Sequence, residues 1–382
     1  MPPISLLLSA GEASGDMYAA RLATALRERL DVQIFGMGGP QMRAAGVDVV
    51  MDYEEVAVVG ITEILKHLPS LLKAMDRIVR EAEQRRPSLA ILTDFPGFHL
   101  RLARKLKPKG IRNVYYICPQ FWAWRPWRAK LIRRRFEKAL CIFPFEKEFF
   151  CGAGVPTEFI GHPLVGIVKA TKDRKTLCEE NGLAPGPAIV TVLPGSRAGE
   201  LMHHLPVLQE ACARINAKMP VQFVIAAAHP KDTELLKVGW PTGVKLRVLA
   251  GETYNALAAA DAVIVSSGTA TVEAALLDAP MVVVYRVSPL TATLARPLVR
   301  TPYFAMVNLI AEKQVVPELV QDAFTPENVA GETLRLLQDP NARATVRNGL
   351  AEVRSRLGPP GAVGRAADAI AALVGSSAGN AS

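Results

Sequence analysis

The sequence has few cysteines and no long hydrophobic run. Its 382 residues include five cysteines, an odd number, and no two of them form a Cys-x-x-Cys pair. That pattern excludes a disulfide framework and a zinc site built from paired cysteines. No apolar stretch approaches the roughly 18 residues of a membrane span. Because the apolar start at residues 4–8 is short and lacks a preceding basic segment, we expect no signal peptide and predict a cytoplasmic protein.

The common phosphate-binding signatures are missing as well. No Gly-Lys-Ser or Gly-Lys-Thr follows a glycine-rich loop, and the Gly-x-Gly-x-x-Gly fingerprint is absent. These absences exclude a Walker-type nucleotide site and the usual dinucleotide site. There is also no Asp-x-Asp motif that would hold a divalent ion on a diphosphate. We therefore predict chemistry that uses neither a metal nor a cofactor.

The sequence does contain many apolar residues and an excess of positive charge. Half of the residues are apolar, and the formal net charge is +9. The apolar fraction is sufficient for ordinary hydrophobic cores, and the length fits two domains. The positive charge points to an anionic partner, and composition alone does not choose among nucleic acid, a phosphate-bearing substrate and an anionic membrane.

Short apolar strands alternate with helical segments in both halves of the chain. Strands of this kind, joined by helices, are typical of a parallel sheet covered on both faces. We predict an α/β protein with two doubly wound domains, residues 1–168 and 169–350. Residues 351–382 are predicted to form a C-terminal helix that crosses back to the first domain, and a flexible tail. The predicted strands are 4–8, 32–35, 88–93, 114–117, 140–143, 158–160, 188–193, 221–226, 244–249, 262–265 and 281–284.

Two loops in the second half have the composition of a diphosphate site. Each follows a predicted strand and opens a helix, which is where open parallel sheets bind anions. Arg197 supplies a charged fork for phosphate oxygens, and Glu273 is placed to accept ribose hydroxyls. The alternative is a pair of ordinary strand-to-helix turns with a structural glutamate. The predicted binding residues are Gly195, Ser196, Arg197, Ser267, Gly268, Thr269, Ala270 and Glu273.

Two further candidate sites follow strands of the first half. The loop at residues 9–16 follows the first strand, and we predict that Gly11, Glu12 and Ser14 line an active site. Capping of the next helix by Ser14 or Asp16 is the alternative. Asp94 follows the strand at 88–93. A carboxylate there is either a helix cap or a general base, and the residues alone do not decide between them.

Two segments of the first half indicate a lipid partner. Residues 61–79 carry apolar side chains at helical spacing, which fits a core helix or a helix that holds acyl chains. Residues 121–138 combine tryptophan with arginine and lysine, which suits an anionic membrane surface, single-stranded nucleic acid or a solvated basic helix. The predicted lipid-contacting residues are Ile61, Ile64, Leu65, Leu68, Leu71, Leu72, Trp122, Trp124, Arg125, Trp127 and Arg128.

In their order along the chain, these motifs resemble the lipid-A-disaccharide synthase family. The resemblance extends from about Ser9 to Glu318, and the ordered set is far more specific than any one motif. It implies an inverting glycosyltransferase of the GT-B architecture, with two Rossmann-like domains facing a central cleft. The matching segments are 9–16, 119–125, 143–146, 159–163, 193–197, 267–273, 285–286 and 308–310.

The resemblance also implies a reaction in lipid A biosynthesis. UDP-2,3-diacylglucosamine would donate its sugar to 2,3-diacylglucosamine 1-phosphate, giving a β-1,6-linked disaccharide 1-phosphate and UDP. Asp94 would be the base for the acceptor hydroxyl, and Asn308 would lie near the uracil or ribose. The loop of Gly11, Glu12 and Ser14 would lie on the acceptor side. The family further implies peripheral contact with the inner face of the inner membrane and no nucleic-acid partner. A homodimer is compatible with the sequence.

The sequence departs from the family pattern just after Asp94. The family usually has a small residue before the proline and a second aspartate three residues after the first. Here Phe95 and Gly97 occupy those positions. Val307 replaces a commoner proline. Two other functions share parts of the pattern: a UDP-N-acetylglucosamine 2-epimerase, which needs no acyl-binding helix, and a lipid-binding protein that retains an inactive transferase fold.

Overall fold

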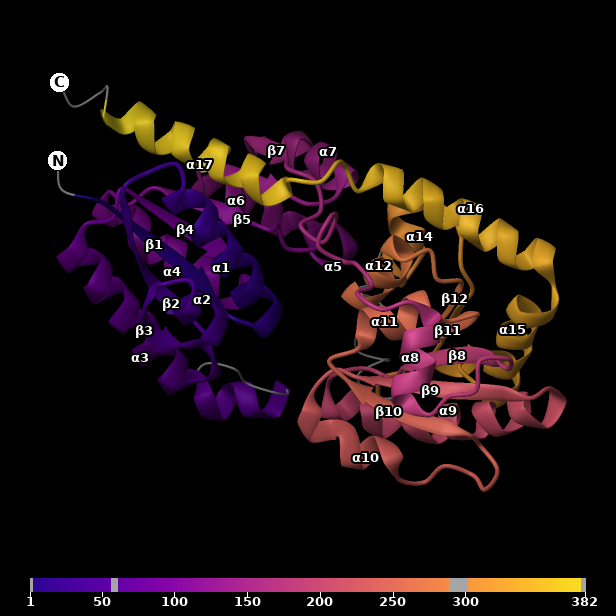
Figure 1. Ribbon diagram of the computed structural model, residues 1–382. Helices are drawn as coiled ribbons and strands as arrows, with labels where there is room; N and C mark the ends of the chain where they lie inside the picture. Colours follow the sequence, from indigo (N-terminus) through magenta and orange to yellow (C-terminus); the bar gives the residue numbers. More distant parts are fainter. Residues whose placement is uncertain (1–2, 56–60, 289–300, 379–382) are drawn as a thin grey trace. The chain divides into compact units, whose positions relative to one another are not determined.

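The chain folds into two compact units, each built around one parallel sheet (Figure 1). The first unit comprises Met1–Pro163 and Gly358–Ser382, and the second comprises Leu164–Leu357. The structure, a computed structural model, describes residues 3–55, 61–288 and 301–378, with the backbone alone for 61–70, 124 and 376–378. The last helix, α17 (Ala362–Ala378), belongs to the unit formed by the start of the chain.

The first unit has a seven-stranded parallel sheet. Its register aligns Ala10 with Thr93, Thr93 with Tyr116, and Tyr116 with Leu140. Four neighbouring strands therefore end side by side, and the residues that follow them gather at one edge of the sheet. In spatial order the strands are β3 (Asp48–Asp52), β2 (Val32–Gly38), β1 (Ile4–Ala10), β4 (Leu89–Thr93), β5 (Asn113–Tyr116), β6 (Lys138–Cys141) and β7 (Thr157–Phe159).

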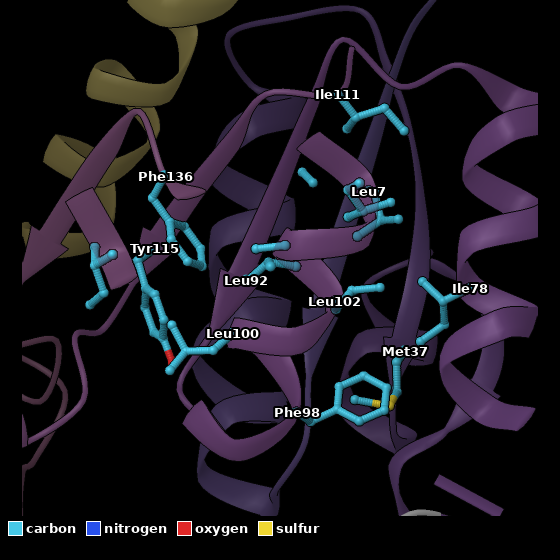
Figure 2. Packing of buried hydrophobic residues seen from close by; sticks show 14 of the residues in the cluster. Leu7, Met37, Ile78, Leu92, Phe98, Leu100, Leu102, Ile111, Tyr115 and Phe136 are labelled. Carbon is cyan, nitrogen blue, oxygen red and sulfur yellow. The ribbon is translucent and has the colours of Figure 1, made fainter. Parts of the chain in front are cut away.

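A hydrophobic core joins this sheet to helices α3, α4 and α6 (Figure 2). Leu7 and Leu92 contribute from the sheet, Ile78 from α3 and Phe98 from α4, all of them buried. Elsewhere in the unit α1 packs against α17. The helices are α1 (Ala13–Arg27), α2 (Pro40–Ala44), α3 (Ile61–Arg85), α4 (Pro96–Leu106), α5 (Phe121–Trp124), α6 (Ala129–Arg135) and α7 (Pro144–Gly152).

The second unit has a six-stranded parallel sheet. Leu193 pairs with Val265, so β8 and β11 end close together and bring their following loops to the same edge. The strands, in spatial order, are β10 (Leu246–Ala250), β9 (Val221–Ala227), β8 (Ala188–Leu193), β11 (Ala262–Ser266), β12 (Met281–Tyr285) and β13 (Glu318–Val320). The helices are α8 (Arg174–Asn181), α9 (Ala198–Lys218), α10 (Thr233–Lys237), α11 (Thr253–Ala258), α12 (Thr269–Leu276), α14 (Met306–Ala311), α15 (Pro326–Gln338) and α16 (Pro340–Arg356).

The predicted α/β fold with two parallel sheets is confirmed, and every predicted strand is present within a few residues. Two short strands, β3 and β13, were not predicted. Both are partly exposed, so they lack the continuous apolar pattern of the central strands. In the part of the chain that the structure describes, no helix combines the length and the apolar character that crossing a membrane requires.

Candidate functional site

The aligned strand ends of the first unit bring Asp94 next to the loop that contains Gly11. Asp94 and Phe95 have backbone φ angles of 50° and 45°, a left-handed conformation that is uncommon outside glycine. The Phe95 ring lies directly against Gly11, where an added Cβ would collide with it. A glycine at position 11 thus permits the close approach of the β1–α1 and β4–α4 loops.

The Asp94 carboxyl has the electrostatic character of a base. Burial raises the pKa of Asp94 to about 6, the negative charge of Glu12 adds to the rise, and a backbone hydrogen bond from Phe95 opposes it. A carboxyl with a pKa close to the working pH is ionised yet still able to accept a proton. The helix-cap interpretation is not supported, because the N-cap of α4 is Phe95 and no side chain caps this helix.

Glu12 and Ser14 are exposed at the start of α1. No side-chain hydrogen bond caps α1. Asp16 instead accepts hydrogen bonds from the backbone N–H groups of Gly39, at 2.7 Å, and Met42, at 3.2 Å. Asp16 therefore caps α2, and the idea that it caps the following helix is wrong. Glu12 and Ser14 keep their polar side chains accessible to a ligand.

The tryptophan–arginine segment, residues 121–138, is packed into the first unit at its start, whereas Trp127 is exposed. Trp122 is half-buried and donates its indole N–H to a carboxyl oxygen of Glu146 at 3.2 Å. Arg125 is half-buried as well. Trp127 is 58% exposed, and the Arg128 guanidinium lies 5.5 Å from the centre of its ring. The segment is therefore neither a plain solvated helix nor wholly part of the core.

Glu146 is a buried acid that sequence reasoning did not select. It is fully buried at the start of α7 and also accepts the backbone N–H groups of Ile142 and Phe143, each at 3.2 Å. Burial raises the pKa of Glu146 to about 8, the three hydrogen bonds oppose the rise, and the charge of Asp94 adds to it. The two acids are therefore electrostatically coupled. In the sequence, Glu146 is marked only by its place in the matching segment 143–146, which does not show that its side chain is buried.

Helix α3 changes character along its length. Its later part belongs to the core, since Met75, Ile78 and Val79 are buried. Leu71 is half-buried and Leu72 is 44% exposed, so the apolar stripe reaches the surface about one turn earlier. Of the predicted lipid-contacting residues, the side chains that lie outside the described residues are those of Ile61, Ile64, Leu65, Leu68 and Trp124.

In the second unit, the loop after β8 is shaped by Glu200. Its carboxyl accepts the backbone N–H groups of Ser196, at 3.0 Å, and Arg197, at 3.4 Å. The side chain of Arg197 is 69% exposed and pairs with the same carboxyl at 3.0 Å. Gly195 has a φ angle of 120° and would carry a Cβ only 2.6 Å from Glu200, so this turn requires glycine. The loop presents an arginine at the start of α9.

A buried histidine holds this loop to the end of another strand. His204 donates its Nδ1–H to the carbonyl of Pro194 at 2.8 Å, and its Nε2 accepts the backbone N–H of Arg286 at 3.0 Å. Burial lowers the pKa of His204, so the ring is neutral at neutral pH, as these two roles demand. The sequence offers no signal for this link, because Arg286 lies 82 residues from His204 along the chain.

The loop after β11 opens helix α12. Gly268 has a φ angle of 154°, and the Ser267 hydroxyl donates to the carbonyl of Phe304 at 2.8 Å. Thr269 is exposed and Ala270 is half-buried. The first backbone N–H groups of a helix have no partner within it, so this end favours an anion.

Glu273 lies on α12, about one turn beyond this loop. The Tyr254 hydroxyl donates to its carboxyl at 3.1 Å. Burial raises the pKa of Glu273, and the bond from Tyr254 opposes the rise. Because one carboxyl oxygen takes the Tyr254 bond, the other remains available to accept a ligand hydroxyl.

Asn308 makes its side-chain hydrogen bonds within the protein. It is fully buried, and its amide donates to the Val316 carbonyl at 3.0 Å and to Glu318 at 2.6 Å. Its oxygen accepts the backbone N–H groups of Val315, at 2.8 Å, and Val316, at 3.0 Å. All four hydrogen-bonding positions of the amide are used within the protein. The amide of Asn308 therefore supports Glu318, and its expected place near the uracil or ribose stays a prediction.

The chain shares its fold with solved structures of other proteins. An S. aureus MnaA–UDP co-structure aligns with a TM-score of 0.68 and 11% identity, covering 96% of each chain. MurG of Acinetobacter baumannii aligns with a TM-score of 0.57 and 18% identity, covering 97% of this chain and 99% of that one. At these identities the likeness concerns the fold, which is the GT-B architecture.

The sequence comparisons extend over nearly the whole chain. The family model for lipid-A-disaccharide synthetase matches residues 6–359. A lipid-A-disaccharide synthase of Solibacter usitatus is 45% identical over 372 residues, or 97% of each chain. Another, of Myxococcus xanthus, is 41% identical over 375 residues, covering 97% of this chain and 98% of that one. The chain therefore belongs to the lipid-A-disaccharide synthase family, the glycosyltransferases that form the disaccharide of lipid A.

Proposed function

We propose that the protein transfers the sugar of UDP-2,3-diacylglucosamine to the 6-hydroxyl of 2,3-diacylglucosamine 1-phosphate. The acceptor oxygen forms a β-1,6 bond to the anomeric carbon, and the bond from that carbon to the UDP oxygen breaks. The acceptor hydroxyl loses its proton in the same step, so a base is required near the acceptor. The configuration at the anomeric carbon is inverted because attack comes from the face opposite UDP.

Asp94 is the proposed base. The position and the pKa of its carboxyl are the observations that carry this assignment. Its carboxyl follows a central strand, has a pKa of about 6 and does not cap α4. Glu12 and Ser14, exposed on the neighbouring strand end, are the proposed acceptor contacts. A proton removed from the acceptor would move to a carboxylate oxygen of Asp94, leaving that group neutral when UDP departs.

The two loops of the second unit are the proposed site for UDP. The exposed guanidinium of Arg197 and the first N–H groups of α12 suit the diphosphate, whose negative charge grows as the sugar leaves. The Glu273 carboxyl, on the following turn of α12, suits the ribose hydroxyls. Gly195, Ser196, Ser267, Gly268, Thr269 and Ala270 complete the proposed set.

The acyl chains and the membrane are assigned to the exposed apolar residues of the first unit. Leu72 is 44% exposed and Trp127 is 58% exposed, and arginines accompany Trp127 in the sequence, which suits an anionic inner-membrane surface. Replacing Leu72 or Trp127 by alanine is expected to weaken sedimentation with anionic vesicles. Leu235, which is 53% exposed in the second unit, is the matched control, and its replacement is expected to have no effect. Equal losses in all three variants would contradict the assignment.

The function is tested by UDP release and disaccharide formation with the two acylated substrates. Either substrate alone is expected to give no disaccharide, and Asp94→Asn is expected to lower the rate of product formation by about 100-fold or more. UDP-N-acetylglucosamine, which lacks the acyl chains, serves as the comparison donor. Turnover of that soluble donor without an acylated acceptor would point to an epimerase instead, and no UDP release with the acylated pair would contradict the proposal.

A further inference from the structure

The backbone carbonyl of Asp94 accepts hydrogen bonds from two buried side chains. The Tyr115 hydroxyl donates to it at 2.7 Å, and Nδ1 of His99 lies 2.8 Å from it. Because a carbonyl oxygen can only accept, Nδ1 of His99 carries the proton. The other ring nitrogen, Nε2, then accepts from the hydroxyl of Ser9, which lies 2.8 Å away. All three of these side chains are fully buried.

These bonds act on a strained piece of backbone. Asp94 and Phe95 are consecutive residues with positive φ angles, and each such residue costs about 1–3 kcal/mol when it is not glycine. The Phe95 ring is held by Phe98, with ring centres 5.7 Å apart, and by the edge of His99, at 5.9 Å. The hydrogen bonds to the Asp94 carbonyl and the ring packing of Phe95 thus fix the turn that sets the direction of the Asp94 side chain.

We propose that Ser9, His99 and Tyr115 are positioning residues, which hold the peptide carbonyl of Asp94 so that its carboxyl stays at the strand end in the orientation that accepts the acceptor's proton. They come from three different elements, β1, α4 and β5. None of them needs to touch a substrate for this role. The inference rests on the proposed role of Asp94 as the base.

The hydrogen-bond pattern stays the same over the working pH range. Burial lowers the pKa of His99 to about 4, so the ring remains neutral and keeps Nδ1 as its donor. Burial also raises the pKa of Tyr115 well above its ordinary value, so its hydroxyl remains a donor. The titratable groups coupled to Asp94 are Glu12, on the β1–α1 loop, and Glu146, at the start of α7, which stays protonated near pH 6. A protonation step observed near pH 6 is therefore assigned to the Asp94 carboxyl.

Two isosteres of His99 separate the proposed role from simple packing. The amide nitrogen of asparagine overlaps Nδ1 and can donate to the Asp94 carbonyl, whereas that of glutamine overlaps Nε2 and faces Ser9. We expect His99→Asn to keep kcat within about threefold of the wild type. We expect His99→Gln to lower kcat by about 30-fold, since displacing a reacting group by about 1 Å costs on the order of 100-fold. The KM values for both substrates are expected to change by less than about twofold.

The pH profile of kcat gives a second readout. In the wild type, kcat is expected to fall below about pH 6 as Asp94 takes up a proton. In His99→Gln the loosened carboxyl meets more water, so its pKa falls and the acid limb moves to lower pH. Tyr115→Phe, which removes the other bond while keeping the ring, is expected to move the limb in the same direction. A role in packing alone would lower the melting temperature and leave the limb in place.

Asp94→Asn shows how much activity remains without the proposed base. It also separates the base assignment from the positioning role. If that variant retains wild-type activity, the base assignment fails, whatever the histidine variants do. If it is inactive but His99→Gln, His99→Asn and Tyr115→Phe all keep the wild-type kcat and acid limb, the positioning role fails alone. Equal losses in His99→Asn and His99→Gln with an unmoved limb also overturn it. If His99→Gln does not fold, Tyr115→Phe decides by the same measurements.

Discussion

Both units contain a buried, neutral histidine that ties a helix to the carboxyl end of a strand, and the two histidines serve loops of opposite charge. In the first unit Nδ1 of His99 donates to the carbonyl of Asp94. In the second unit Nδ1 of His204 donates to the carbonyl of Pro194, just before the loop that carries Arg197. In each unit, desolvation keeps the imidazole uncharged, so that it can donate from one nitrogen and accept at the other.

The two units also share a capping glutamate with different surroundings. Glu146 caps α7, and Glu200 caps α9. Glu200 has an arginine partner at 3.0 Å, whereas the partners of Glu146 are two backbone N–H groups and an indole. The same fold thus supports an acidic, partly desolvated site in one unit and a cationic, exposed site in the other. Such a division suits a reaction in which one unit removes a proton and the other stabilises a departing anion.

The largest expected effect comes from removing the carboxylate of the first unit. Asp94→Asn is expected to lower kcat by about 100- to 10,000-fold, the usual contribution of a general base. The dissociation constant for UDP, measured by calorimetry, is expected to be unchanged, because the proposed UDP site lies in the second unit. Weaker UDP binding in this variant would contradict the assignment of the base and the UDP site to different units.

Removing the Arg197 side chain, the cation of the second unit, is expected to weaken UDP binding and to leave the pH dependence of kcat unchanged. Arg197→Ala is expected to weaken UDP binding by about 10- to 100-fold, since a hydrogen bond to a charged group contributes about 1.5–3 kcal/mol. The acid limb of kcat is expected to stay near pH 6. Arg335 is the matched control, because it too pairs with a glutamate three residues away, Glu332 at 2.7 Å. Arg335→Ala is expected to leave UDP affinity unchanged, and an equal loss there would contradict the assignment.

Variants of His204 test whether the histidines of the two units serve separate functions. His204→Asn keeps a donor for the Pro194 carbonyl, and His204→Gln loses it. His204→Gln is expected to weaken UDP binding by about 3- to 10-fold, which corresponds to one ordinary hydrogen bond. Its acid limb is expected to stay where it is in the wild type, in contrast to His99→Gln. A shift of the limb in His204→Gln would mean that the two histidines do not serve separate functions.

Local patterns in the sequence predicted the sheets and the loops but not the links between them. The central strands were predictable because they bury every residue and read as continuous apolar runs. The loops at Pro194 and Ser267 were predictable because each follows such a run directly. Strand β13 has three residues and packs only at the sheet edge, which leaves too short a pattern to detect.

The remaining site features depend on contacts between distant residues. His99 bonds to Ser9, 90 residues earlier, and Asp16 caps a helix whose first residues lie more than twenty positions away. Asn308 matched the family motif, yet its amide is fully used by the protein. A residue type and its spacing show what a side chain is able to bind, whereas burial decides whether a ligand reaches it.

The capping glutamates predict a difference in how stability depends on pH. Unfolded, Glu146 ionises near pH 4.5, and folded it stays protonated up to about 8. Between these values the unfolded chain binds fewer protons, so the free energy of unfolding falls as pH rises. Glu146→Gln removes this effect, so its stability relative to the wild type is expected to rise by up to about 1.4 kcal/mol per pH unit in that window. Urea unfolding near pH 5 and pH 8 measures it.

Glu200→Gln is the matched variant in the second unit. It removes a carboxyl from the equivalent capping position and leaves Arg197 without that partner. The glutamine oxygen can still accept the loop N–H groups but forms no ion pair with Arg197, so we expect a loss of stability of up to about 1 kcal/mol at both pH values. If Glu146→Gln behaves in the same way, with no dependence on pH, the proposed desolvation of Glu146 is wrong.

The smallest expected effects come from two glycines in equivalent positions. Gly97 is the second residue of α4, and Gly199 is the second residue of α9. A Cβ at either position would meet nothing within 4 Å, so Gly97→Asp and Gly199→Asp fit without strain. Each is expected to raise the free energy of unfolding by about 0.5–1.5 kcal/mol, because glycine is replaced in a helix and an acid is added to its first turn.

The functional consequences of these two variants are expected to differ between the units. Gly97→Asp restores the family's second aspartate and adds a negative charge three residues from Asp94. Like charges raise the pKa of a carboxyl, so the acid limb of kcat is expected to move to slightly higher pH. Gly199→Asp adds its charge two residues from Arg197, so UDP binding is expected to weaken by a few-fold while the limb stays in place. Thermal unfolding, calorimetry with UDP and the pH profile of both variants distinguish these outcomes. A matching limb shift in both would show that the added charge acts on the whole protein rather than on the acidic site of one unit.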